Sequence, residues 1–410
     1  MTLRARLPSG AGPTVAYRDG NVVRWTAAYT ASVSGDVVFF LTLSWAVTQL
    51  AGPAQVGAVL AVGAVPRAVL MLAGGVIADR YGPRRVVIGS DLARCLIVLG
   101  AAALMQFAIA RLWMLFAVAL IFGVIDALFM PAVGALAGRL TDPGQLGRVQ
   151  GLRMLAVRLS NAVGPMIAAM VLTAAGVAVG LGLAGLLFSL SVGLLLAVRL
   201  NRIEPGVRKT GSPLADLKDG LKHLRGNRQL TRLVLVVGLG ELCFSGPVGI
   251  GLVLLTAERH WAASVLGWTL SAFSIGGAAA GILLTALTRI RRAGVVLACC
   301  LLATAVLVGA LGQVTTAGML IAGSALLGTV SGAASAIGNA LLQRNTDPRY
   351  LGRVGSVTSL STVGLSPLLY PIAGVVAALW GTAAFFAGCA LICLLATATA
   401  ATKSVRTSDL

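Results

Sequence analysis

Long apolar runs, each bounded by Gly, Pro or charged residues, alternate with short polar stretches along the whole chain. A helix that crosses a membrane needs about 20 predominantly apolar residues, and these runs provide them. The pattern predicts an all-α integral membrane protein with 12 transmembrane helices, six in each half of the chain. In the first half they cover 22–50, 55–77, 86–109, 112–137, 149–175 and 178–199. In the second half they cover 229–257, 262–288, 294–314, 316–341, 354–378 and 381–402.

The composition excludes several classes of function. Of the 410 residues, 58% are hydrophobic and 11% are charged, and the mean hydropathy is +0.93. The predicted helices and their loops use up this length, so we expect no separate soluble catalytic domain. The six cysteines fall in apolar runs and the two histidines lie far apart, which predicts neither disulfides nor a metal site. The sequence has no P-loop motif, and we expect no ATP, no other cofactor and no enzymatic activity.

The formal net charge of +19 would suggest a nucleic-acid partner in a soluble protein, but the positions of the basic residues indicate otherwise. When the helices are followed in order, most of the Lys and Arg residues fall in loops and tails on one side. Only Arg111 and Arg259 fall in loops on the other side. Cytoplasmic loops of membrane proteins carry such an excess. The pattern predicts cytoplasmic N- and C-termini, contact with anionic lipid headgroups at that face, and no nucleic-acid partner.

The two halves of the chain share an internal repeat. Residues 141–149 (TDPGQLGRV) and 346–354 (TDPRYLGRV) are identical at seven of nine positions. Both segments follow the fourth predicted helix of their half in the same orientation, which is typical of a parallel repeat about an axis along the membrane normal. The repeat predicts two six-helix bundles related by a pseudo-two-fold axis. The predicted domains are a tail at 1–21, bundles at 22–199 and 229–402, a basic linker with an amphipathic helix at 200–228, and a tail at 403–410.

The loop between the second and third predicted helices resembles the loop signature of the major facilitator transporters. It reads GVIADRYGPRR over 75–85, against G-x-L-A-D-R-x-G-R-R in that family, and departs from it at Ile77 and Pro83. The resemblance implies a latch at the cytoplasmic face, where the acid meets a helix N-terminus and the arginines pair with acids or lipid phosphates. The second half has no acid at the position of Asp79. The gate residues implied are Gly75, Asp79, Arg80, Gly82, Arg84 and Arg85.

Further segments resemble one drug-exporting branch of this family, which includes macrolide-efflux and enterobactin-exporter proteins. They are YTASVSGD at 29–36, DLAR at 91–94 and the loop from Leu342 to Arg353. Gly164 and Pro165 in the fifth helix also resemble the glycine–proline motif of antiporters. The resemblance covers about residues 22–400. It implies proton-driven export of a bulky amphipathic molecule, by a monomer in the cell membrane.

Charged residues inside the predicted helices are costly in a bilayer and are therefore functional candidates. Asp36 lies midway along the first helix, where loss of water favours the protonated form of a carboxylate. We expect Asp36 to couple proton movement, to pair with an arginine such as Arg67 or Arg158, or to face a wet cavity. Glu241 is its counterpart in the repeat, so both acids are expected beside a central cavity, suited to protons or a cationic drug. Arg67 is expected either to counter Asp36 or to hold an anionic substrate.

Four more charged residues are assigned to the cytoplasmic gate. Asp91 and Arg94 are three residues apart on one helix face. Asp126 is expected to form a salt bridge with a latch arginine or with Arg153. Together with the loop residues, these side chains would stabilise one access state of a transporter.

The sequence favours a secondary active exporter that exchanges protons for an amphipathic drug, antibiotic, siderophore or secondary metabolite. A metabolite importer or uniporter of the same fold is the main alternative, although the helices contain few of the polar and aromatic residues that a sugar site needs. A membrane sensor that transports nothing is a further alternative. A membrane prenyltransferase would need a paired Asp site, and the close pair Asp216 and Asp219 lies among basic residues of the linker.

Overall fold

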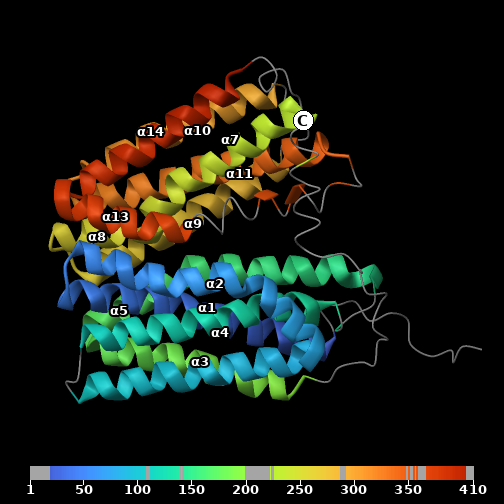
Figure 1. The fold of residues 1–410 in the computed structure, drawn as a ribbon, viewed down its shortest axis with the longest axis vertical. Helices are drawn as coiled ribbons and strands as arrows, with labels where there is room; N and C mark the ends of the chain where they lie inside the picture. The colour runs from blue at the N-terminus through green and yellow to red at the C-terminus, as the bar shows by residue number, and fades with distance from the viewer. Residues whose placement is uncertain are drawn as a thin grey trace, which may run out of the picture.

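The computed structural model is an assembly of long helices (Figure 1). It describes residues 19–107, 111–138, 140, 143–198, 222, 226–286, 292–347, 350, 354–355, 357–358 and 366–402. The first half contains α1 (Gly20–Leu50), α2 (Pro53–Tyr81), α3 (Pro83–Gln106), α4 (Leu112–Ala137), the 3₁₀ turn η2 (Pro143–Gln145) and α5 (Leu146–Leu196). The second half contains α7 (Arg228–Gly246), the π-helical turn η3 (Pro247–Gly251), α8 (Leu252–Glu258), α9 (Ala263–Ala286), α10 (Ala293–Leu311), α11 (Ala317–Arg344), α13 (Ser366–Trp380) and α14 (Thr382–Ala400). All regular structure in this described part is helical, as the sequence predicts.

Local sequence explains where several helices begin. The Asp19 carboxylate accepts a hydrogen bond from the backbone N–H of Asn21 and caps α1. Pro53 and Pro83 occupy the first positions of α2 and α3, where the missing N–H has no helical partner to lose. Gly82, between those two helices, has a φ of 87°, which favours glycine over any other residue. The short turn between α2 and α3 therefore depends on the glycine of the loop signature.

The helices have the length and composition of membrane spans. Ten helical stretches in the described residues are long and apolar enough to cross a bilayer, and Pro367–Trp380 is a shorter apolar helix. One of the ten stretches, Arg228–Glu258, consists of α7, η3 and α8 together. The number of twelve spans and the cytoplasmic side of the termini stay predictions. The linker at 200–228 and the tails at 1–21 and 403–410 lie largely outside the described residues.

Helix α5 is far longer than one bilayer crossing. Its 51 residues would extend about 75 Å, against a hydrocarbon core of about 30 Å. The backbone of Gly176 is not helical, with a φ of 79° and a ψ of −177°. This break falls between the helices that the sequence predicts over 149–175 and 178–199. The two segments of α5 are therefore described separately below, as the parts before and after Gly176.

The helices of the two chain halves occupy two regions of the molecule. In Figure 1, α1 to α5 lie in the lower half of the view and α7 to α14 in the upper half. Between the regions, α2 packs against α13, and α5 packs against α9. One apolar cluster includes side chains from both halves, such as Phe122 of α4 and Phe386 of α14. The halves thus form two bundles that meet chiefly along these two helix pairs.

Glycines allow these inter-bundle contacts to be close. A Cβ on Gly57 of α2 would collide with the carbonyl oxygen of Tyr370 in α13. A Cβ on Gly374 of α13 would lie 2.6 Å from the carbonyl oxygen of Pro53. On the other helix pair, a Cβ on Gly267 of α9 would lie 2.5 Å from the carbonyl oxygen of Pro165 in α5. Gly57 and Gly267 lie near the starts of α2 and α9. Gly374, in the second half of α13, faces Pro53 at the start of α2, so the bundles are joined at one end.

Candidate functional site

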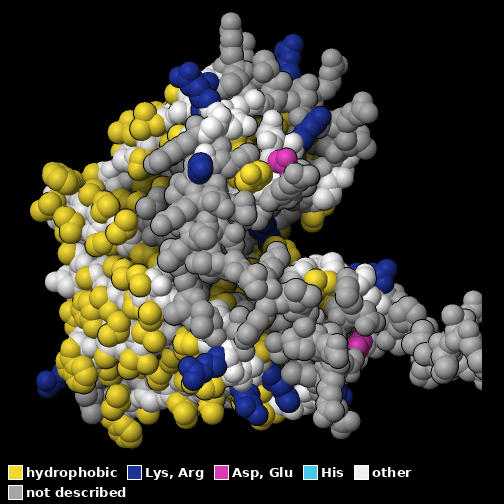
Figure 2. Space-filling model, turned by 45° about the vertical axis from the view of Figure 1, so that its right-hand side comes forward, with side chains coloured by type: hydrophobic (Ala, Val, Ile, Leu, Met, Phe, Trp, Pro, Cys, Tyr) yellow, Lys and Arg dark blue, Asp and Glu magenta, His cyan; other side chains and the backbone are white. Residues whose placement is uncertain are grey.

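A cavity of about 790 Å³ lies between the two bundles. Figure 2 shows the corresponding hollow between the halves of the molecule. Helices α1, α2, α4 and α5 line it from the first half, and α7, η3, α8, α9 and α11 line it from the second. The wall is mostly apolar, with a small number of polar groups, which is the usual make-up of a small-molecule site. The charged and amide-bearing residues on it are Asp36, Arg67, Arg158, Asn161, Glu241 and Asn339.

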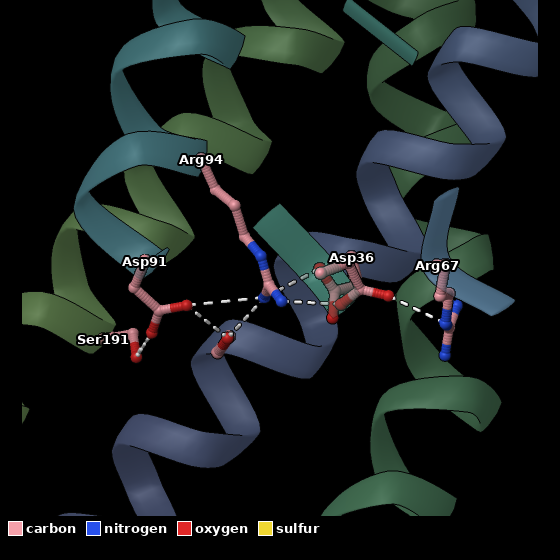
Figure 3. Close-up of polar contacts among 7 residues, drawn as sticks. Asp36, Arg67, Asp91, Arg94 and Ser191 are labelled. Atoms are coloured by element: carbon pink, nitrogen blue, oxygen red, sulfur yellow. Dashed lines mark hydrogen bonds and ion pairs between the residues drawn. The ribbon is translucent and has the colours of Figure 1, made fainter. Parts of the chain in front are cut away.

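A buried ionic cluster lies next to the part of the cavity wall that the first half of the chain forms. Arg94 is at the centre of this cluster (Figure 3). The guanidinium of Arg94 lies 2.6 Å from the Asp126 carboxylate and 3.3 Å from that of Asp36. Its side chain has no exposed surface, whereas 19% of the Asp36 side chain is exposed. Because Asp36 also lines the cavity, it connects the buried cluster with the space between the bundles.

Asp91 is the innermost acid of this cluster. Its carboxylate lies 3.4 Å from Arg94, and it accepts hydrogen bonds from the hydroxyls of Ser32 at 2.9 Å and Ser191 at 2.6 Å. These contacts come from α1, from α3 itself and from the second part of α5. Both oxygens of the buried carboxylate therefore have partners, and Asp91 holds three helices together.

The partners of Asp126 differ from those that the sequence predicts. Asp126 pairs with Arg94 and with Arg67, at 2.6 Å and 2.9 Å, and not with a latch arginine or Arg153. The expectation was wrong because it placed Asp126 toward the gate, whereas α2, α3 and α4 bring it against two arginines beside the cavity. Arg67 likewise pairs with Asp126 and not with Asp36, whose basic partner is Arg94.

The cluster holds three carboxylates against two guanidiniums. Arg94 also lies over the ring of Phe129, with its Cζ 3.9 Å from the ring centroid, and this contact favours the cation. If every carboxylate is ionised, the cluster keeps one negative charge that neither arginine balances. A charge left unbalanced away from water is costly, so one bound proton would complete the balance. Among the three acids, Asp36 has the most exposed side chain and thus the most direct contact with the cavity.

Glu241 lies on the opposite wall, in α7. Its carboxylate accepts a 2.7 Å hydrogen bond from the hydroxyl of Ser335 in α11. Within the described residues no ion pair involves Glu241. The structure thus brings the repeat-related acids Asp36 and Glu241 to one cavity but gives them unequal surroundings. One is tied to an ionic cluster and the other to a single hydroxyl.

The residues of the predicted gate are spread over several environments. Arg84 donates to the carbonyl oxygens of Leu195 and Leu196 at 3.4 Å and 3.1 Å, at the negative end of α5. Arg80 and Arg85 are exposed, and a Cβ on Gly75 would meet no atom within 4 Å. The side chain of Asp79 lies outside the described residues, so its predicted contact with a helix N-terminus stays a prediction.

Arg153 contacts an aromatic ring. Its Nε donates to the Tyr29 hydroxyl at 3.3 Å, and its guanidinium lies over the same ring at 5.4 Å. Tyr29 is also part of the cavity wall. Arg153 therefore supports the wall near the start of α1.

The glycine–proline motif lies where three helices meet. A Cβ on Gly164 would lie 2.9 Å from a methyl group of Val37, so α5 approaches α1 closely beside Asp36. Pro165 is the residue that Gly267 of the other bundle approaches, and it also lines the cavity. The motif thus packs one bundle internally and joins it to the other.

Sequence reasoning missed the polar stripe on α11. Ser331, Ser335 and Asn339 all line the cavity, and one of them binds Glu241. They are spaced by four residues, which places them on one helix face, and this spacing could have identified them. Sequence analysis proposed Arg158 only as a partner for Asp36. In the structure the Arg158 side chain is exposed on the cavity wall.

Comparisons with known proteins agree with this architecture. The model of the Major Facilitator Superfamily matches residues 25–255 and 242–408. The enterobactin exporter EntS of Shigella boydii serotype 18 is 26% identical over 327 residues, 76% of this chain and 76% of the exporter. EntS of Escherichia coli O139:H28 matches with the same identity and coverage.

Solved structures of transporters share the fold. The nucleoside transporter NupG has a TM-score of 0.72 and 13% identity, covering 93% of this chain and all of its own. A bacterial homologue of the iron transporter ferroportin, in an inward-facing state, has a TM-score of 0.68 and 18% identity. The match covers 94% of this chain and 99% of the homologue. At these identities the similarity establishes the arrangement of helices and leaves the substrate open.

Proposed function

Because the chain belongs to the Major Facilitator Superfamily, we propose that it is a secondary active exporter that exchanges amphipathic small molecules for protons. The observation that carries the proposal is the cavity between the bundles, which has Asp36 on one wall and Glu241 on the other. Its apolar lining suits a bulky amphiphile. The similarity to an enterobactin exporter over 76% of the chain supports the outward direction of transport.

The ionic cluster provides a place for the coupling proton. A proton on Asp36 would leave two carboxylates to balance Arg94 and Arg67, whereas its loss would place an unbalanced charge at the edge of the cavity. The two charge states favour different arrangements of α1, α3 and α4, because these helices carry Asp36, Arg94 and Asp126. Proton binding and release would therefore shift the equilibrium between access states. Glu241 is the second proton or substrate site, since its only observed partner among the described residues is the Ser335 hydroxyl.

The gate and the lipid contacts complete the proposal. The loop between α2 and α3, with Asp79 and its arginines, would stabilise the state in which the cytoplasmic face is closed. Its exposed arginines, Arg80 and Arg85, would contact anionic headgroups of the cell membrane. The protein would act as a monomer, with both termini in the cytoplasm.

The test is transport by everted vesicles with fluorescent amphiphiles of different charge. Energised uptake should disappear with an uncoupler and in Asp36→Asn, while downhill exchange of labelled for unlabelled substrate should persist in the variant. Exchange needs the alternating access of the protein but no net proton movement, so its persistence separates lost coupling from lost folding. Asp36→Glu should restore part of the uphill transport.

A control and two contrary results make the test decisive. Asp19→Asn keeps a capping residue at the start of α1 and should transport normally. Uphill transport that ignores the uncoupler would exclude proton antiport. Accumulation in the opposite direction would favour the importer, and equilibration without accumulation would favour the uniporter.

A further inference from the structure

Arg158 is a charged residue of the cavity that the proposed mechanism does not use. It lies in α5, 12 residues after the start of the helix, which corresponds to about 18 Å along the helix axis. Its side chain is exposed and lines the space between the bundles. Within the described residues, Arg158 has neither an ion pair nor a hydrogen bond. A cation without a counter-charge within a membrane-spanning helix marks a functional site by default.

Arg158 reaches toward the opposite bundle. A Cβ placed on Gly277 of α9 would lie 3.9 Å from Nη1 of Arg158. The same Cβ would lie 3.5 Å from the carbonyl oxygen of Gly328, and a Cβ on Gly332 would lie 3.0 Å from the Cα of Gly277. Gly277 of α9 therefore faces the guanidinium, and it packs against Gly328 and Gly332 of α11. No side chain from these positions supplies the guanidinium with an acidic partner.

The other charges around the cavity are engaged elsewhere. Asp91 and Asp126 are buried and bound to Arg94, and Asp126 also neutralises Arg67. Asp36 is held by Arg94, and Glu241 accepts a hydrogen bond from Ser335. Neither acid lies within 4 Å of Arg158. Among the described residues that line the cavity, Arg158 is thus the one cation without a counter-ion. The second guanidinium on the wall, that of Arg67, is on the same bundle and its side chain is 35% exposed.

We propose that the transported substrate carries an acidic group, a carboxylate or an ionised phenol, which binds to Arg158. This inference rests on the proposed function and specifies its substrate class. The planar guanidinium donates two parallel hydrogen bonds to such an anion and binds it with defined geometry. Phe273, one helical turn before Gly277 in α9, also lines the cavity and provides an apolar surface for the hydrophobic part of the substrate. Arg67 lies on the same bundle and adds to the positive potential.

Three probes with one ring system and different charges test the proposal. They are 1-pyrenebutyrate, its neutral primary amide, and the matching pyrenebutyl trimethylammonium ion. Binding of each is measured by fluorescence with the purified full-length protein in nanodiscs, after subtraction of binding to empty nanodiscs. We expect the carboxylate to bind about tenfold more tightly than the amide, which corresponds to one charge-assisted contact. Arg158→Gln should remove this preference, and Arg158→Lys should keep part of it.

A matched variant controls for changes in overall charge. Arg148→Gln removes an exposed arginine at the start of the same helix, outside the cavity wall, and should keep the preference for the carboxylate. Equal binding of the three probes, tightest binding of the ammonium ion, no binding at all, or an unchanged preference in Arg158→Gln would each overturn the proposal. A preference for the ammonium ion that disappears in Glu241→Gln would assign the cavity to cations instead.

The result is separable from that of the transport experiment. If the carboxylate binds selectively through Arg158 but vesicles accumulate no probe, the substrate class stands and proton-driven export fails. If vesicles export the ammonium ion in exchange for protons, export stands and the acidic substrate fails.

Discussion

Arg94 and Arg158 show how the surroundings of one residue type decide its role. Both lie well inside apolar helices, yet the Arg94 side chain has no exposed surface and contacts three carboxylates. Arg158 is exposed to the cavity, and no acid in the described part of the chain lies within salt-bridge distance. In the first arrangement the ion pairs of the guanidinium tie α1, α3 and α4 together. The second leaves binding capacity for a molecule from outside.

The difference predicts unequal effects of the two substitutions on the stability of the protein. Arg94→Gln removes a buried cation from beside Asp91 and Asp126, and breaking such a pair costs about 3–5 kcal/mol. The apparent melting temperature of the purified protein in detergent should fall clearly. Arg158→Gln breaks no observed ion pair and should melt close to the wild type. Similar melting of the two variants would show that the ionic cluster contributes little to folding.

At the scale of single residues, the sequence indicates which charged residues are functional candidates but not which residues on other helices they contact. The repeat relates position 36 to position 241, and the structure brings both acids to one cavity. The repeat does not reveal that Asp36 pairs with Arg94, because that contact depends on how α1 and α3 are rotated against each other. Spacing of three residues placed Asp91 and Arg94 on one face, and they do form an ion pair. Local geometry follows from sequence distance, whereas contacts between helices do not.

Among the elements, α5 contains a feature that depends on one residue. Gly176 adopts a φ of 79° with an extended ψ, a conformation that is essentially restricted to glycine. Gly176→Ala should therefore cost about 1–3 kcal/mol and lower the apparent melting temperature. Gly182 lies six residues later in the same helix, and a Cβ added there would meet no atom within 4 Å. Gly182→Ala should therefore be neutral or slightly stabilising. Equal melting of the two variants would indicate that the break does not need a glycine.

Helix ranges were predictable because length and apolar composition define a membrane span. The predicted helix at 112–137 corresponds to α4 at Leu112–Ala137, and the one at 22–50 corresponds to α1 at Gly20–Leu50. The π-helical turn η3 within the predicted helix at 229–257 was not foreseen. Pro247 begins that turn, and a proline indicates an irregularity without specifying its kind. The amphipathic helix predicted in the linker lies outside the described residues.

In the whole molecule, the two bundles are joined at one end and separated by the cavity. The contacts at the joined end involve backbone atoms, since Gly57 faces the carbonyl of Tyr370 and Gly374 faces that of Pro53. The cavity extends to Gly281 and Asn339, near the other ends of α9 and α11. The structure is therefore open toward one side. On the predicted orientation, with cytoplasmic termini, that side is the cytoplasm.

This arrangement predicts that adding one methyl group at the joined end changes the access state. A Cβ on Gly57 would collide with α13, so Gly57→Ala should separate the bundles there and favour opening toward the opposite side. Ser44, which lines the cavity, provides a reporter as Ser44→Cys, labelled with an impermeant maleimide from either side of oriented vesicles.

In the parent protein the introduced thiol should react mainly from the cytoplasmic side, and in Gly57→Ala its reaction from the external side should increase. Gly100→Ala in α3 places its methyl group in open space and should label like the parent, while protein without Ser44→Cys corrects for the native cysteines. A packing defect alone would increase labelling from both sides, whereas a shift between access states must lower one rate as it raises the other. Unchanged labelling in Gly57→Ala would mean that the close contact of α2 with α13 does not hold the external side closed.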